Sequence, residues 1–388
     1  MSKFADRLQD IEPFHVMALL ARARQLEAEG KSIIHMEIGE PDFPTAQGIV
    51  EAGIKALEAG KTKYTPALGL PALREAIAQD YAERYSLELS SSRVVITPGA
   101  SGALQLVCSA LINPGDEVIM SDPTYPCNRH FVRLFEGRAV SVPVNADSAY
   151  QLTAAMVAAN WTSKTVAVLL ASPSNPAGTL IPERELREIA AVVKSRGGVL
   201  IVDEIYHGLT YEAEPISALA LDCEVFVINS FSKYYGMTGW RLGWLAAPGQ
   251  TVPAIEKLAQ NFFLAAPTIA QYAALAAFTK DVQAEFLLRR DQFRQRRDYL
   301  CPALKRLGFK IPVIPDGAFY VYCDVSSFTN NSEQFCETLL NEAGVAVTPG
   351  KDFGAYGAGH HVRFSYANTI ENLEIGVTRI KKFLDEQV

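Results

Sequence analysis

Short, continuously apolar runs alternate with amphipathic stretches along most of the chain after about residue 70. An unbroken apolar run of about 4–8 residues is typical of a parallel strand whose two faces are both covered. Such runs occupy residues 94–97, 117–120, 166–170, 199–202 and 225–228. The alternation therefore predicts an α/β fold, with a large, mostly parallel sheet covered by helices.

Helical periodicity accompanies these runs. Residues 73–81 and 186–193 place apolar side chains at every third or fourth position, which is the spacing of one helix face. Each stretch follows a proline, Pro71 or Pro182, and proline favours the first turn of a helix. We therefore expect a helix with one buried face at each place.

The last part of the chain has a different pattern. It predicts a long charged helix over about residues 285–304, a strand over 318–324 and a final amphipathic helix over 369–384. This combination indicates a smaller α+β domain. The expected divisions are 1–38 for an N-terminal segment that joins the small domain, 39–283 for the large domain, and 284–388 for the small C-terminal domain.

Composition narrows the range of partners. The chain has 388 residues, of which 49% are apolar and 20% charged, as in an ordinary globular protein with two domains. Its net charge of -7 and the lack of a Lys/Arg cluster argue against nucleic acid as a partner. The apolar runs are far shorter than a membrane span, so we expect no membrane partner.

The cysteines and the N-terminus indicate a cytoplasmic protein. Six cysteines are scattered without a C-x-x-C pair, as in a reducing compartment. The first residues carry mixed charges and lack the apolar stretch of a signal peptide. Six histidines show no metal-ligand spacing, and neither a G-x-S-x-G elbow nor a P-loop is present. We therefore expect no metal site.

Polar or glycine-rich segments stand directly after four of the apolar runs, at residues 97–102, 172–178, 203–206 and 230–241. Ligands of open α/β sheets collect at the carboxyl ends of the strands. These four segments are therefore the first candidates for a functional site.

The stretch from Ser101 to Leu111 has a helical pattern, and the small residues Gly99 and Ala100 directly precede it. Small residues at this point would let a phosphate reach the free N–H groups and the positive end of the helix dipole. An ordinary strand-to-helix turn is the simpler interpretation of this segment alone.

Ser230, Ser232 and Arg241 could complete the same anion site, since two hydroxyl groups and a permanent cation match the oxygens of a phosphate ester. Lys233 lies among them, flanked by aromatic residues. Such surroundings can shift a lysine toward the neutral amine that attacks a carbonyl group. Without the other segments, a solvated surface lysine would be the better interpretation.

Asp203 ends a strongly apolar run, so its carboxylate is expected to emerge from the middle of the sheet and to need a partner. A protonated pyridine nitrogen is one such partner, and holding that proton makes the ring an electron sink. The alternative is a helix N-cap, a position that Asp also favours. Tyr206 and Asn175 could donate hydrogen bonds to an oxygen on the ring.

Taken in order, the motifs of this chain resemble those of the class I aminotransferases, which are fold-type I pyridoxal-phosphate (PLP) enzymes, and in particular the bacterial aspartate/alanine/aromatic branch. The resemblance covers nearly the whole chain. The motifs that carry it are Ile38-Gly-Glu-Pro-Asp-Phe, Lys63-Tyr-Thr-Pro-Ala-Leu-Gly-Leu-Pro-Ala-Leu-Arg-Glu-Ala, Ser174-Asn-Pro-Ala-Gly, Asp203-Glu-Ile-Tyr, Ser230-Phe-Ser-Lys, Gly239-Trp-Arg-Leu-Gly-Trp and Val362-Arg-Phe-Ser-Tyr.

The resemblance implies a role for each matching residue in catalysis and around the PLP ring. Lys233 would be the Schiff-base lysine and proton shuttle, Asp203 would pair with the pyridine nitrogen, and Tyr125 would stack on the ring. Tyr206 and Asn175 would bind the phenolic oxygen.

Phosphate and substrate contacts are implied in the same way. The phosphate would be bound by Gly99, Ala100, Ser101, Ser230, Ser232 and Arg241. Arg363 would grip the substrate α-carboxylate as a bidentate fork, assisted by Gly39 and Asn175. Tyr64 would reach the phosphate of a neighbouring subunit, which implies a homodimer with shared active sites.

The implied activity is transfer of an amino group from an L-amino acid to a 2-oxo acid, by a ping-pong mechanism through aldimine and pyridoxamine forms. Related aspartate enzymes carry a lysine where this chain has Ser101, and residues 261–267 offer no arginine for a second carboxylate. Val16 and Met17, on the expected lid helix, make the pocket more apolar. We therefore expect neutral or apolar donors, namely alanine, branched or aromatic amino acids, with 2-oxoglutarate as an acceptor that the family favours.

Two alternatives keep the fold and change the function. PLP-dependent β-lyases and cyclopropane-forming synthases share most of these residues but break a different bond. Ligand-sensing regulators with an aminotransferase-like domain carry a DNA-binding domain in front of it, and here the motifs begin at Gly39, which leaves no room for one.

Overall fold

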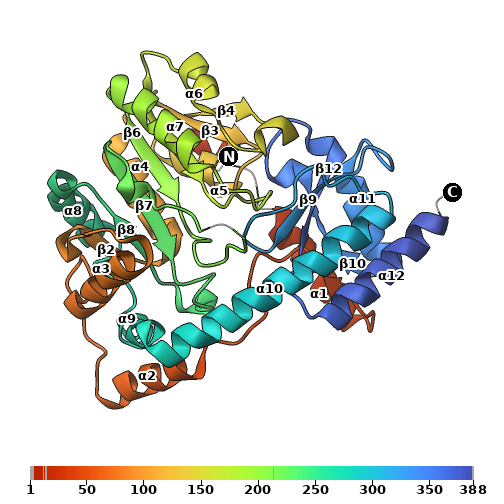
Figure 1. The fold of residues 1–388 in the computed structure, drawn as a ribbon, viewed down its shortest axis with the longest axis horizontal. Helices are drawn as coiled ribbons and strands as arrows, with labels where there is room; N and C mark the ends of the chain where they lie inside the picture. Colours follow the sequence, from red (N-terminus) through yellow and green to blue (C-terminus); the bar gives the residue numbers. More distant parts are fainter. Residues whose placement is uncertain (1–3, 12, 14, 213, 387–388) are drawn as a thin grey trace.

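The computed structural model describes residues 4–11, 13, 15–212 and 214–386 (Figure 1). Its centre is a sheet of seven strands in the order β2-β8-β7-β6-β5-β3-β4. These strands are β2 (Val94–Thr97), β3 (Glu117–Asp122), β4 (Arg138–Pro143), β5 (Thr165–Ala171), β6 (Val199–Asp203), β7 (Val225–Ser230) and β8 (Gly243–Ala246). Only the pairs that include β8 are antiparallel. The predicted α/β fold with a mostly parallel sheet is confirmed.

Helices cover both faces of this sheet. Side chains of β7 alternate between the two faces, so Val225 and Val227 pack in one apolar core while Phe226 and Ile228 pack in the other. The second core includes residues of α4 (Gly99–Leu111), α5 (Cys127–Leu134) and α8 (Val252–Phe262), and the first includes residues of α3 (Pro71–Tyr85) and α7 (Glu183–Ser195). Because each strand is buried on both faces, its sequence is continuously apolar.

The rest of the chain is built around α10 (Lys280–Arg306), a helix about 40 Å long that runs from the large sheet to the C-terminal elements (Figure 1). A second sheet has the order β11-β12-β9 and is antiparallel. Its strands are β9 (Tyr320–Asp324), β11 (Thr348–Pro349) and β12 (His361–Ser365). The remaining helices are α2 (Gln47–Glu58), α6 (Ala154–Asn160), α9 (Thr268–Ala274), α11 (Ser332–Thr338) and α12 (Ile370–Glu386).

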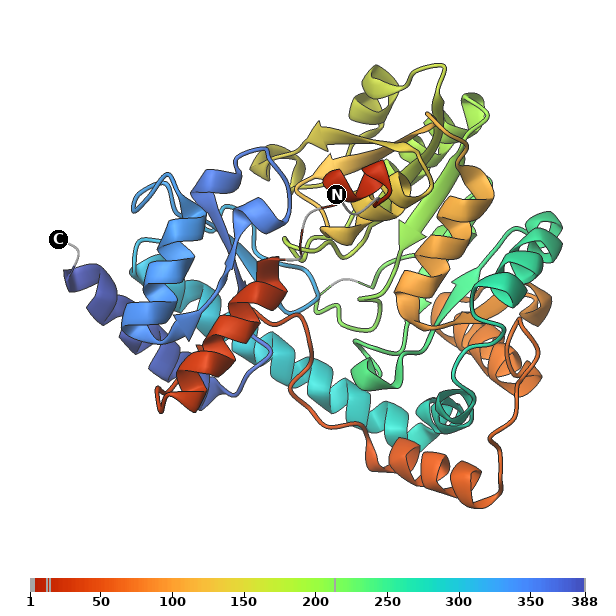
Figure 2. The same cartoon turned by 180° about the vertical axis from the view of Figure 1, so that it is seen from behind.

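The N-terminal helix α1 (His15–Ala28) lies against these C-terminal elements, as Figure 2 shows. The strand that follows it, β1 (Ile34–His35), pairs in parallel with β10 (Val345–Ala346). Segments from the two ends of the sequence therefore pack together. The expected boundary at 283/284 falls just inside α10, and the division into domains stays a prediction.

Two strands of the large sheet were absent from the expectations. In β4 most side chains are partly or fully exposed, so the strand lacks a continuous apolar run. The sequence of β8 begins with Gly243 and Trp244, the last two residues of the Gly239-Trp-Arg-Leu-Gly-Trp motif, where no strand was predicted. The predicted strands and helices are otherwise present, with ends shifted by a few residues.

Candidate active site

A cavity of about 420 Å³ lies at the carboxyl ends of β5, β6 and β7. Its other walls come from α1, the start of α4, β9 and β12. All of the predicted site residues except Gly99 and Tyr64 line it. They are Gly39, Ala100, Ser101, Tyr125, Asn175, Asp203, Tyr206, Ser230, Ser232, Lys233, Arg241 and Arg363. The site therefore forms where the strand-end rule for α/β sheets places it.

Lys233 follows β7 and points into this cavity, where its Nζ donates a hydrogen bond to the backbone oxygen of Gly39. Burial and the guanidinium groups of Arg363 and Arg241 lower the pKa of Lys233 to about 8, although Glu40 acts in the opposite direction. About one tenth of this amine is therefore neutral at pH 7. Neutral amine is the form that attacks a carbonyl group.

Asp203 is the last residue of β6, the middle strand of the sheet, and is only 6% exposed. Burial raises the pKa of its carboxyl group to about 6, while a hydrogen bond from the Ile205 N–H to Oδ1 (3.0 Å) acts against this rise. Turns rather than a helix follow β6, so the interpretation of Asp203 as a helix N-cap is wrong. Its carboxylate faces the same cavity as the Lys233 amine.

The start of α4 is packed closely against β8 and Arg241. A Cβ atom on Gly99, whose φ is +70°, would lie 2.8 Å from Nη2 of Arg241. A Cβ atom on Gly243 would lie 2.9 Å from the backbone nitrogen of Ala100. Both glycines are therefore required by close approach, and together they leave the first N–H groups of α4 beside the cavity.

Hydroxyl groups and a cation surround this helix terminus. Ser230 Oγ donates to Ser232 Oγ (2.9 Å), and both residues are buried. Arg241 Nη1 donates to the Thr238 backbone oxygen (2.8 Å), and no acidic side chain among the described residues pairs with this guanidinium. A cation, two hydroxyls and a helix N-terminus form a donor set that suits a phosphate group.

Arg363, on β12, is 4% exposed and has no carboxylate partner within the described part of the chain. Its Nη1 donates to Asn175 Oδ1 (2.9 Å) and its Nη2 to the Glu37 backbone oxygen (2.5 Å), while Nε has no partner. The guanidinium lies over the Tyr320 ring, 4.2 Å from its centroid. The hydrogen bonds of this buried cation go only to neutral groups, and Asp352 is an acidic residue near enough to interact with it electrostatically. Such a guanidinium can still accept an anionic ligand.

Tyr206 and Tyr320 share a hydrogen bond between their hydroxyl groups (2.9 Å), and both are buried. Burial raises the pKa of Tyr206 well above its ordinary value, so this hydroxyl keeps its proton and can donate it to a ligand oxygen. Tyr320 was expected only as part of a strand. Its contact with Gly39 and Arg363 depends on the packing of β9 beside β12, which the sequence pattern does not reveal.

Other residues missed by sequence reasoning also line the cavity, among them Leu20, Arg24, Ile38, Glu40, Leu104, Ile205 and Thr238. Leu20 and Arg24 lie on the same face of α1 as Met17, at helical spacings of three and four residues. This spacing was the available signal, because Val16 and Met17 were already expected on a lid helix.

The two predicted residues outside the cavity, Gly99 and Tyr64, lie in different places. Gly99 lies directly behind Arg241, as its close contact shows. Tyr64 is 81% exposed and is remote from the cavity lining of its own chain. The position of Tyr64 allows a contact with a second molecule, and its expected role stays a prediction.

Among the described residues, no group of three or more His, Cys, Asp or Glu side chains is arranged to hold a metal ion. The described helices include none that is both long and apolar enough to cross a membrane. All six cysteines are free thiols.

Comparison with known proteins decides the family. The model of the family "Aminotransferase class I and II" matches residues 31–380. The chain belongs to this aminotransferase family. It is 40% identical to (5-formylfuran-3-yl)methyl phosphate transaminase of Methanocaldococcus jannaschii, over 98% of this chain and 99% of that protein. It is 38% identical to valine–pyruvate aminotransferase of Mycobacterium tuberculosis, over 97% of each chain.

Solved structures agree with this assignment. The structure of aspartate aminotransferase from Thermus thermophilus with maleate matches with a TM-score of 0.93 and 35% identity, covering 98% of this chain and 100% of that one. Members of the family are PLP-dependent transaminases that act on amino acids and 2-oxo acids, and so is this enzyme. The cavity fits PLP because it offers a partly neutral lysine amine, a buried carboxylate and a phosphate-type donor set.

Proposed function

We propose that this aminotransferase takes amino groups from neutral or apolar L-amino acids, with Lys233 as its covalent lysine and proton carrier. The observation that carries the proposal is the single cavity that contains the Lys233 amine, the buried Asp203 carboxylate and the Arg363 guanidinium. An amine, an acid and an anion site in one enclosed space match a cofactor ring and a substrate α-carboxylate bound side by side.

PLP, when bound, supplies a carbonyl group that captures amines and a ring that withdraws electrons from the substrate α-carbon. Lys233 would remove the proton from that carbon through Nζ, because its pKa of about 8 suits a base that works near neutral pH. Asp203 would keep a proton on the ring nitrogen. Tyr206 and Asn175 would hold the phenolic oxygen.

Anion recognition would be divided between two places. Arg241, Ser230 and Ser232 would hold the phosphate with the N-terminus of α4, where Gly99, Ala100 and Ser101 lie. Tyr125 would cover one face of the ring. Arg363 would bind the substrate α-carboxylate with Gly39 and Asn175, and its orientation is already fixed by the hydrogen bonds to Asn175 and Glu37.

The preference for apolar donors is supported by the side chains that line the cavity on the side of α1. Val16, Met17 and Leu20 contribute apolar side chains from α1, and Ile38 and Leu104 add to them from other segments. Relatives differ on this point, since their names include valine–pyruvate, aspartate/prephenate and furan phosphate substrates. The apolar wall therefore supports the assignment more directly than any single relative.

The test is a panel of amino donors, with 2-oxoglutarate and pyruvate as acceptors, and with product 2-oxo acids measured by chromatography. We expect higher kcat/KM for alanine, valine, leucine or phenylalanine than for aspartate. A clear preference for aspartate would overturn the assignment of donor class. Release of pyruvate and ammonia from a donor without any acceptor would favour a β-lyase instead.

We also propose that the enzyme is a homodimer in which Tyr64 of one subunit reaches the phosphate site of the other. Exposed apolar side chains on α2, at Tyr64 and around the end of α8 support a contact surface, namely those of Ile54, Leu57, Tyr64, Phe262 and Leu264. Light scattering at micromolar concentration gives the mass directly. A monomer that is fully active would contradict the proposal.

The state of the cysteines bears on the cellular compartment of the enzyme. Free thiols at all six cysteines support a reducing compartment, and we propose the cytoplasm. Fractionation of the source cells with an antibody against the chain tests this, and recovery outside the cytoplasmic fraction would exclude it.

A further inference from the structure

Arg24 contributes a cation to the rim of the active-site cavity. It lies on α1, one helical turn beyond Leu20, on the face that carries Met17 and Leu20. Sequence reasoning found no second cation for a substrate side chain, because it considered only Ser101 and residues 261–267. The folded chain supplies one from a different element.

Arg24 differs from the other cations of the cavity. Lys233, Arg241 and Arg363 each donate a hydrogen bond to the protein. Arg24 has no hydrogen bond or ion pair to any described residue, and it is exposed. Its neighbour Arg22 faces away from the cavity lining and donates to Asn341 (3.1 Å). Arg24 is therefore available to a ligand.

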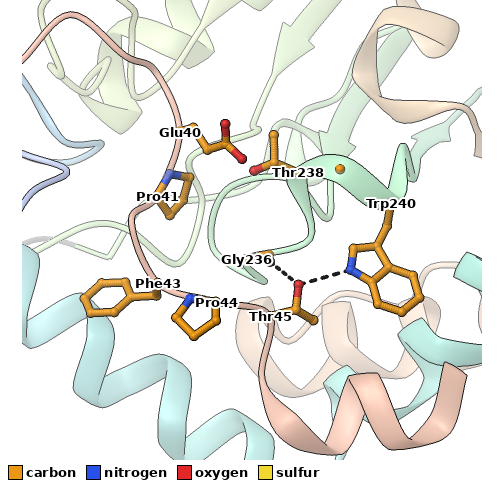
Figure 3. Close-up of a pocket in the computed structure, with 9 residues that line it drawn as sticks. Glu40, Pro41, Phe43, Pro44, Thr45, Gly236, Thr238 and Trp240 are labelled. Carbon is orange, nitrogen blue, oxygen red and sulfur yellow. Dashed lines mark hydrogen bonds between the residues drawn. The ribbon is translucent and has the colours of Figure 1, made fainter. Parts of the chain in front are cut away.

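Glu40 is the acidic side chain that could compete, because it also lines this cavity. A second cavity of about 410 Å³ adjoins the first and shares Glu40 and Thr238 with it. Figure 3 shows the Glu40 carboxylate turned toward Thr238 in this second cavity. No ion pair joins Glu40 to Arg24 among the described residues. Glu40 therefore does not neutralise the positive charge of Arg24.

We propose that Arg24 binds the second carboxylate of a 2-oxo dicarboxylic acid acceptor such as 2-oxoglutarate. The proposal rests on the proposed function, since Arg363 must hold the first carboxylate. Val16, Met17 and Leu20 line the same cavity as Arg24 and would cover the methylene groups of such an acid.

This arrangement lets one pocket serve two kinds of substrate in turn. An apolar donor packs against Met17 and Leu20 and leaves Arg24 in water, where its charge needs no partner. A diacid reaches past the same side chains to the guanidinium. A flexible, exposed arginine therefore adds a charge contact for the acceptor without burying a charge beside the donor.

The test compares Arg24→Met with the wild-type holoenzyme, using 2-oxoglutarate and 2-oxopentanoate, which has the same carbon chain without the second carboxylate. The KM ratio of 2-oxoglutarate to 2-oxopentanoate should rise in Arg24→Met by up to about fivefold, which is the upper end of the range for an exposed ion pair. Arg24→Lys should recover part of this change. Arg22→Met is the matched control and should leave the ratio at its wild-type value.

Binding without turnover gives a second measurement. Glutarate and pentanoate, which lack the 2-oxo group, should compete with the acceptor, and Arg24→Met should weaken inhibition by glutarate alone. Salt should weaken glutarate inhibition more strongly in the wild type than in the variant, in which Arg363 alone remains to bind a carboxylate. Equal changes for mono- and diacids, or no change, would overturn the role of Arg24. Absence of transamination in the wild type would instead overturn the proposed function.

Discussion

The floor and the rim of the active-site cavity are built by different means. Asp203 and Arg363 on the floor are 6% and 4% exposed and stand on strands of the two larger sheets. On the rim, Met17 is 56% exposed and Arg24 is exposed as well, and both stand on one surface helix. Close packing holds the buried side chains of the floor in place, whereas the exposed side chains of the rim have fewer neighbours and tolerate substitution better. This difference agrees with the proposal that the floor carries the chemistry and the rim the selectivity.

The helix α1, which carries the rim residues, is attached to the rest of the protein by polar contacts at its two ends. The N–H of His15, at the start of the helix, donates to Asp352 Oδ1 (3.1 Å). Near its other end, His35 lies between Glu27 on the helix and the buried Glu37, with nitrogen–oxygen distances of 3.2 and 2.8 Å. Polar contacts at its two ends therefore hold the helix, in addition to the apolar contacts of Ala23 and Leu26.

The largest effect is expected for Lys233→Ala, which removes the amine from the floor. We expect kcat to fall about 10⁴-fold or more, because both the covalent attachment and the proton transfer are lost. Initial rates with alanine and 2-oxoglutarate measure this. Lys194→Ala, an exposed lysine paired with Asp222, is the matched control. Wild-type turnover in Lys233→Ala would remove Lys233 from the mechanism.

Asp203→Asn keeps the shape of the floor and removes its charge. We expect kcat to fall on the order of 10³-fold, with little change in KM, because the ring nitrogen would lose the carboxylate that keeps it protonated and the ring would then withdraw electrons less strongly. Steady-state kinetics separates the two constants. A variant in which KM rose and kcat stayed at the wild-type value would show that Asp203 serves binding rather than chemistry.

His35→Asn tests the attachment of the rim to the rest of the protein. Hydrogen bonds to Glu37, and the charges of Glu37 and Glu27, raise the pKa of His35, although burial acts against them. Because the folded pKa is above the unfolded value of about 6.5, protonation stabilises the fold fully below pH 6.5, and this stabilisation is lost as pH rises through the folded pKa.

The variant should therefore lower the free energy of unfolding by on the order of 1 kcal/mol at pH 5.5, and by less at pH 8. Urea unfolding of the apoprotein at the two pH values measures the difference. The exposed His360→Asn serves as control. A loss of stability that is the same at both pH values would show that the charge of His35 plays no part.

The smallest effect is expected for Met17→Ala on the rim. It should lower kcat/KM for leucine or phenylalanine about threefold, since a half-exposed side chain gives up only part of its apolar contact area. The value for alanine, which is too short to reach Met17, should fall less. A uniform loss for all donors would mean that Met17 supports the helix rather than the substrate.

Sequence patterns predicted the floor far better than the rim. Asp203 and Lys233 follow apolar runs, and parallel strands bring their carboxyl ends to one edge, so these residues could be placed together in advance. Arg24 and Tyr320 could not, because their positions depend on the pairing of β1 with β10 and of β9 with β12. The first pairing joins segments about 310 residues apart and the second joins segments about 40 residues apart, and neither leaves a local pattern in the sequence. The part of the pocket that we propose to select the substrate is therefore the part that sequence alone describes least.

Gly243 limits how far the protein can be re-engineered. Even the methyl group of alanine at this position would press on the first turn of α4, 2.8 Å from the backbone carbon of Gly99. The end of the pocket proposed to bind the phosphate is consequently closed to redesign, and a library aimed at new substrates would keep residues 99–101 and 243 constant. Diversity belongs at the exposed, cavity-lining positions of α1, such as Met17 and Arg24, where a changed side chain leaves the sheet undisturbed.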